Sequence, residues 1–157
     1  MSALAAVLTV EQLWLPAPGG SGTYIEHLIR ALARRSDVEV TGLSAWHGST
    51  ARVPVPVRRW PLPRRATDLV WPRLRGAGAF SAPRDAVLHA TTWAVPPHRG
   101  PLVVTVHDLA FLRDPGHFTP HGNRFFRRAM SVVRDEADAV VVPSRATAED
   151  CLRAGFE

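Results

Sequence analysis

Residues 3–34 read ALAAVLTVEQLWLPAPGGSGTYIEHLIRALAR, and this stretch decides the fold class. The apolar run at 3–10, with β-branched residues near its end, predicts a central strand covered on both faces. Prolines and glycines then predict a loop, and from Thr23 the apolar residues recur with helical spacing as far as about Ser36. A buried strand followed by an amphipathic helix is typical of a parallel α/β sheet.

The rest of the chain repeats this alternation. Short apolar runs predict further strands at 38–43, 53–60, 86–89, 102–106 and 139–142. The strand at 53–60 carries two prolines and therefore belongs at an edge. Helices are predicted at 66–75 with an interruption at Pro72, at 121–137, and from Ser144, which can cap a helix ending at Gly155. We predict an α/β, Rossmann-like three-layer domain with an open, mostly parallel sheet, which binds ligands at the carboxyl ends of its strands.

Length and composition favour one cytoplasmic domain. The 157 residues suit a single core, and the only cysteine, Cys151, excludes an internal disulfide and a thiolate metal cluster. The first residues lack the basic region of a signal peptide, and no apolar run approaches the roughly twenty residues of a membrane span. We expect a cytoplasmic protein that is soluble, or peripheral at the inner face of the membrane.

Arginine supplies all 19 basic residues, and the excess lies in the middle of the chain, where residues 52–100 hold nine arginines and two acids. The stretch 58–75 interleaves these arginines with Trp60 and Trp71. Three interpretations stay open: a solvated face, a surface that meets an acceptor or an anionic membrane, and a nucleic-acid site. For Phe126, in a second arginine-rich segment, core packing is favoured because it lies on the apolar face of its helix.

The glycine motif Gly19-Gly20-Ser21-Gly22-Thr23 lies between the first strand and the first helix. Glycines let backbone amides approach an anion, and the helix dipole favours negative charge there, so a phosphate or carboxylate site is one interpretation. A purely structural loop is the other. No lysine follows, which excludes a P-loop, and the third glycine of a dinucleotide fingerprint is missing.

Two histidines follow predicted strands. His89 closes the strand at 86–89, and His107 with Asp108 comes directly after the strand at 102–106. Both imidazoles should face the ligand-binding edge, where they can bond a sugar hydroxyl or steady a developing positive charge; a strand-end histidine bonded to a backbone carbonyl is the alternative. His117 and His121 are separated by Pro120, and no metal site or resident cofactor is predicted.

Taken together, these segments resemble the N-terminal domain of family 4 glycosyltransferases, a retaining group with the GT-B fold that includes many bacterial mannosyl- and glucosyltransferases. The matching segments span about 130 residues, and their order and spacing make the set specific. They are residues 19–24 followed by Leu28 and Leu32, residues 88–91, residues 105–109 and residues 142–144.

The resemblance implies roles for individual residues. His107 is the implied active-site histidine, which contacts the transferred sugar near its reacting carbon. The implied donor-diphosphate residues are Gly19, Gly20, Ser21 and Gly22. The implied acceptor- or sugar-binding residues are His89, Thr91, Asp108 and Tyr24. Thr91 departs from the pattern, because many relatives carry a second histidine there.

The resemblance also implies the partners. Residues 1–157 are expected to form the acceptor-side domain, while the C-terminal domain that binds the donor nucleotide in relatives is expected to be absent from this chain. The complete enzyme would transfer a mannose- or glucose-like hexose from a nucleotide-sugar donor to a carbohydrate or lipid-linked acceptor, and the isolated chain would be inactive. The stretch 58–75 would supply any peripheral membrane contact. A stand-alone flavodoxin-like module that binds an anionic small molecule is the alternative, and a nucleic-acid-binding domain is a third.

Overall fold

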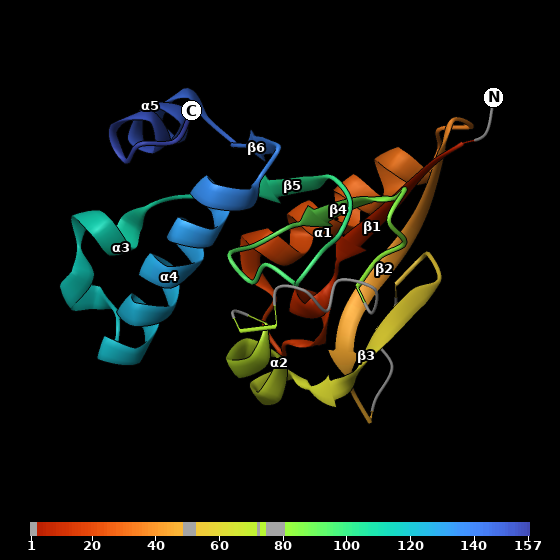
Figure 1. Cartoon of the computed structure of the whole chain (residues 1–157), viewed down its shortest axis with the longest axis horizontal. Helices are drawn as coiled ribbons and strands as arrows, with labels where there is room; N and C mark the ends of the chain where they lie inside the picture. The colour runs from red at the N-terminus through yellow and green to blue at the C-terminus, as the bar shows by residue number, and fades with distance from the viewer. Residues whose placement is uncertain (1–2, 49–52, 72, 75–80) are drawn as a thin grey trace.

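A computed structural model describes residues 3–48, 53–71, 73–74 and 81–157, which form an α/β domain around a parallel sheet (Figure 1). The sheet has the order β3-β2-β1-β4-β5-β6, and every strand pair in it is parallel. The strands are β1 (Leu4–Thr9), β2 (Val38–Trp46), β3 (Val57–Pro63), β4 (Val87–Ala90), β5 (Leu102–Thr105) and β6 (Ala139–Val141). This architecture confirms the predicted Rossmann-like fold, with β3 at an edge.

Helices follow β1, β3, β5 and β6, whereas β2 and β4 are followed by the next strand with no helix among the described residues. The helices are α1 (Gly19–Ala33), α2 (Arg64–Val70), α3 (Ala110–Arg113), α4 (Pro120–Glu136) and α5 (Arg145–Arg153), with short 3₁₀ helices η1 (Glu11–Trp14) and η3 (Pro115–His117). The elements α3 and η3 lie between the predicted strand at 102–106 and the predicted helix at 121–137, in a segment for which no helix was predicted. Pro72, the expected interruption of a longer α2, lies outside the described residues.

The glycine motif forms the first turn of α1, which corrects the prediction of a loop that ends at Thr23. The amide of Gly22 donates to the carbonyl of Pro18 at 3.1 Å, so the helical bonding pattern is already established before Thr23. Gly19 has a φ of 62°, a left-handed value that glycine adopts without strain. The connection from β1 to α1 is made by η1 and residues 15–18 instead.

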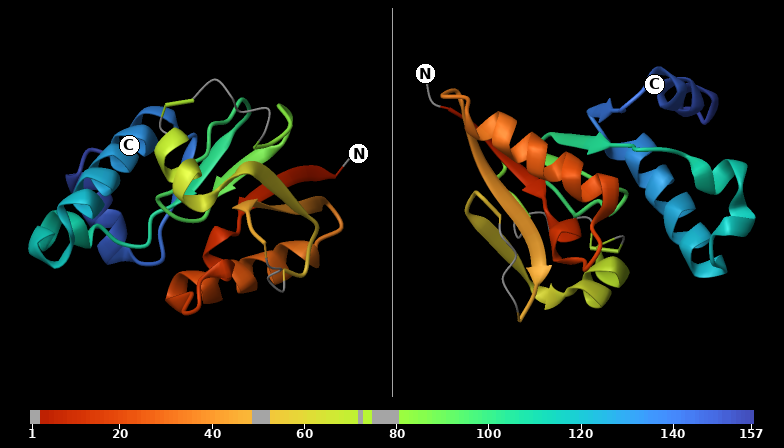
Figure 2. Two further views of the ribbon diagram at one scale, coloured as in Figure 1. Left: turned by 90° about the horizontal axis from the view of Figure 1, so that it is seen from below. Right: turned by 180° about the vertical axis from the view of Figure 1, so that it is seen from behind.

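Each face of the sheet has its own apolar cover. On one face, Ile25 and Ile29 of α1 pack in a cluster with Leu8 and Val10. The left view of Figure 2 shows α1 on one side of the strands and α4 on the other. On the α4 side, Ala129 and Val133 pack in the second cluster, and with Phe126 and Met130 they form the predicted apolar face of the helix.

Two tryptophans of the arginine-rich stretch also belong to this second cluster. Trp60 and Trp71 are each 3 % exposed, and their rings meet edge to face with centroids 5.8 Å apart. Both large rings pack in the core cluster on the α4 side and so help cover the sheet. Their burial corrects the idea that both rings lie exposed between the arginines, although Trp71 also lines the cleft described below.

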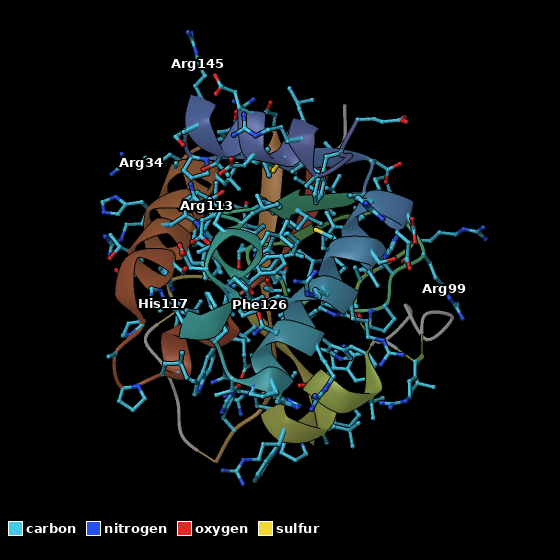
Figure 3. All side chains as sticks on the ribbon, turned by 90° about the vertical axis from the view of Figure 1, so that its left-hand side faces the viewer. Arg34, Arg99, Arg113, His117, Phe126 and Arg145 are labelled. Atoms are coloured by element: carbon cyan, nitrogen blue, oxygen red, sulfur yellow. The ribbon has the colours of Figure 1, made fainter. Side chains whose placement is uncertain are left out.

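Side-chain hydroxyl groups cap the last two long helices, and the cap of α5 is the one that the sequence predicts. The Ser144 hydroxyl accepts a hydrogen bond from the amide of Thr147 at 3.1 Å, and Gly155, with a φ of 82°, follows the end of α5. Thr119 caps α4 in the same way through the amide of Gly122. Figure 3 looks onto α3 and α4, where the ring of Phe126 stacks on Phe111. None of the helices in the described part of the chain is long and apolar enough to cross a bilayer.

Candidate functional site

The carboxyl ends of β4 and β5 bring together three of the predicted site residues. His89 in β4 places its Nε2 atom 2.8 Å from the hydroxyl of Thr105 at the end of β5. The Tyr24 hydroxyl of α1 reaches the same Thr105 oxygen at 2.9 Å. The Tyr24 ring meets the imidazole of His107 edge to face, with centroids 5.1 Å apart. Thr105 therefore links His89 and Tyr24 by hydrogen bonds, and the Tyr24 ring adds His107 to the group by packing on it.

His89 is half-buried and is held in this group by its hydrogen bond to Thr105. Burial lowers the pKa of its imidazole to about 4, so the ring is neutral at physiological pH. A neutral imidazole bonded to Thr105 cannot balance the charge of a phosphate. The geometry makes His89 a support for Thr105 and Tyr24.

His107 follows β5 and lines an open cleft at the edge of the sheet. Its Nε2 atom lies 3.0 Å from the backbone carbonyl of Thr91, and since a carbonyl only accepts, the imidazole donates this hydrogen bond. In the neutral ring, Nδ1 is then left as an acceptor. This arrangement combines the two interpretations made from the sequence: the histidine is bonded to a strand-end carbonyl and it still faces a ligand space.

Thr91 contributes its backbone and not its side chain. The residue is 0 % exposed, and its hydroxyl donates to the carbonyl of Thr9 at 2.6 Å while its amide donates to the Thr9 hydroxyl at 2.8 Å. These bonds join the ends of β1 and β4. The predicted contact of the Thr91 side chain with an acceptor does not agree with this placement, because its hydroxyl is turned into the protein.

The glycine turn opens toward the same cleft at Ser21, which lines it together with His107. The first amides of a helix have no intrahelical partner, so those of Gly19, Gly20 and Ser21 remain available to an anion. Gly22 differs, because its amide is bonded to Pro18 and a Cβ at this position would overlap the Pro18 ring. Of the four predicted diphosphate residues, Ser21 lines the cleft, Gly19 and Gly20 precede it in the same turn, and Gly22 packs the turn.

The cleft has a volume of about 950 Å³, within the range of small-molecule sites. Asp108 lines it and is exposed, and its carboxylate accepts a hydrogen bond from the amide of Ala110 at 2.9 Å. His121 lines it as well, from the first turn of α4. Among the residues that the structure describes, no group of three metal-ligating side chains forms a metal site.

The sequence model of Glycosyltransferase Family 4 matches residues 18–157. The chain belongs to glycosyltransferase family 4. A search of curated proteins finds no match to it. The match begins at Pro18, directly before the glycine turn, and includes every predicted site residue. Glu11 and Gln12, which also line the cleft, precede the matched range.

The sequence interpretation missed one polar pair of the family 4 domain. Glu11, directly after β1, lines the cleft, and its Oε2 accepts a hydrogen bond from the amide of Ala45 at 2.9 Å. His47, directly after β2, places Nε2 3.0 Å from the same oxygen, and the Trp14 ring stacks on it with centroids 4.8 Å apart. A signal was available, because Glu11 is the first charged residue after the apolar run at 3–10.

Proposed function

We propose that this family 4 domain is the acceptor-side half of a retaining glycosyltransferase. The complete enzyme moves a mannose- or glucose-like hexose from a nucleotide sugar to an acceptor. The bond between the anomeric carbon and the donor diphosphate breaks, and a bond from that carbon to the oxygen of an acceptor hydroxyl forms on the same face of the sugar. The hydroxyl proton leaves with the diphosphate. A further domain binds the donor nucleotide across the cleft. No metal or resident cofactor takes part.

One observation carries this proposal: Ser21 of the glycine turn and His107 line the same cleft. In that arrangement the first amides of α1 stabilise the negative charge of the departing diphosphate. His107, oriented by the Thr91 carbonyl and by the Tyr24 ring, contacts the sugar near its reacting carbon. Donor phosphate and sugar are thereby held side by side, which is the arrangement that lowers the barrier to transfer.

The test is His107→Ala in the complete two-domain enzyme. We expect turnover to fall by about 100-fold or more, since a positioned polar group at the reacting centre typically contributes that much. His117→Ala is the matched control, because His117 is an exposed histidine ten residues away in η3 that does not line the cleft. Thermal unfolding of both variants separates a lost contact from a lost fold. Unchanged turnover in a folded His107→Ala enzyme would remove the role assigned to His107.

A further inference from the structure

Arginines from separate parts of the chain line the cleft. Arg64 and Arg65 come from the start of α2, Arg73 follows that helix, and Arg124 and Arg128 lie one turn apart on α4. Against these five guanidinium groups the lining holds two carboxylates, Glu11 and Asp108. The helices α2 and α4 are about fifty residues apart in the chain, so this concentration of positive charge exists only in the folded protein.

Among the described side chains, three of these arginines have no neutralising partner. The Nε atom of Arg64 lies 4.0 Å from Glu11, but Arg65, Arg124 and Arg128 form no ion pair with any residue that the structure describes. Elsewhere on the surface, Arg30 pairs with Glu26 and Arg35 with Asp37. Like charges that line one cleft repel one another, and a bound anion removes this cost.

The guanidinium groups of these arginines favour a phosphate over a carboxylate as the bound anion. A guanidinium group presents a planar fork of donors that matches phosphate oxygens, and three such forks exceed the needs of a single carboxylate. The cleft also has apolar lining, including Trp93, Phe118 and Phe125, so the group that bears the phosphate need not be polar throughout.

We infer that the acceptor is a phosphate or pyrophosphate ester, whose phosphate is bound by Arg65, Arg124 and Arg128 while its hydroxyl group reaches His107. This inference rests on the proposed function and adds the class of acceptor to it. The phosphate belongs either to a water-soluble molecule or to a lipid headgroup. In both cases these guanidinium groups hold the acceptor by a part of the molecule that does not react.

Titration calorimetry of the 157-residue chain with inorganic pyrophosphate tests the inference. The triple variant Arg65→Gln, Arg124→Gln, Arg128→Gln is expected to bind pyrophosphate about tenfold more weakly or worse, because charge-assisted bonds are lost. The matched control is Arg34→Gln, Arg127→Gln, Arg145→Gln, which removes the same charge from exposed arginines outside the cleft lining. Figure 3 shows Arg34 and Arg145 at the outside of the molecule. The control is expected to stay within about twofold of the parent chain.

Vesicles distinguish the two sources of phosphate. If phosphatidylcholine vesicles that contain phosphatidic acid recruit the parent chain and the control but not the cleft variant, the phosphate is lipid-borne. If pyrophosphate binds and such vesicles do not, the acceptor is water-soluble. Three results would each overturn the inference. The first is an equal loss of pyrophosphate binding in both triple variants, and the second is no binding of pyrophosphate by the parent chain. The third is binding of a single-stranded oligonucleotide by a chain that does not bind pyrophosphate. These assays involve no sugar transfer, so their result is independent of the His107→Ala test.

Discussion

A single methyl group added at Gly22 and at Gly20 should have opposite effects on the same turn of α1. In Gly22→Ala the new Cβ would overlap Cβ of Pro18, lie 3.1 Å from its Cγ and come within 3.9 Å of Leu13. The proline ring is rigid, so the backbone has to move, and such overpacking costs about 1–3 kcal/mol. The gain in helix propensity recovers at most about 1 kcal/mol of this.

Gly20→Ala meets no such obstacle. A Cβ at Gly20 has no neighbour within 4 Å among the described residues, and its φ is not in the left-handed range. Replacing this glycine restricts the unfolded chain and should stabilise the fold by about 0.4–1 kcal/mol. The two variants should therefore differ by roughly 1–3 kcal/mol in free energy of unfolding, although each adds one methyl group.

The substitution Gly20→Ala should weaken donor binding although it stabilises the fold. In the complete enzyme, the added methyl group stands where the donor diphosphate approaches the amides of the helix, so Gly20→Ala should raise KM for the donor. Urea unfolding of the chain followed by circular dichroism measures the first effect, and initial rates of the complete enzyme measure the second. Equal midpoints for the two variants would refute the packing argument, and an unchanged donor KM in Gly20→Ala would refute the diphosphate role.

Two further predictions follow from the site. The pKa of His89 is about 4 in the folded chain and near 6.5 in the unfolded chain, so between these pH values the unfolded chain binds more protons. The free energy of unfolding should therefore fall as the pH drops from 6.5 to 4, by up to about 3 kcal/mol from His89. Urea unfolding at pH 7 and pH 5 should show a smaller loss of stability in His89→Gln than in the parent chain. A loss of equal size in the variant would contradict the assignment. Because transfer needs both walls of the cleft, the 157-residue chain alone should have no transferase activity in a radiolabelled sugar-nucleotide assay, and turnover by it would refute the two-domain proposal.

Local sequence patterns predicted much of the fold. The alternation of apolar strands with amphipathic helices, the cap at Ser144 and the stop at Gly155 depend on residues within one or two turns of each other, and the structure reproduces all of them. The edge position of β3 was predicted correctly, although Pro54 and Pro56, on which the prediction depended, precede the observed strand. The start of α1 was wrong, because the glycines that favour a loop are held in a helical turn by the bond from Gly22 to Pro18.

The candidate site was predicted less completely, since its contacts join residues that are far apart in the chain. Thr91 is bonded to Thr9, which lies 82 residues earlier, and so its side chain is buried. Glu11 and His47 are joined only because β1 and β2 are neighbours. No local pattern contains either pairing.

The sequence by itself determined the order of strands and helices along the chain, the family to which the chain belongs and the position of a histidine directly after β5. Each of these depends on residues that are close together in the chain. The tertiary structure alone decided which polar groups share the cleft. The parallel crossovers place β1 between β2 and β4, and they bring α2 and α4 to the same cleft. For this reason the tryptophans of an arginine-rich stretch became core, while arginines from two distant helices became one wall of the site.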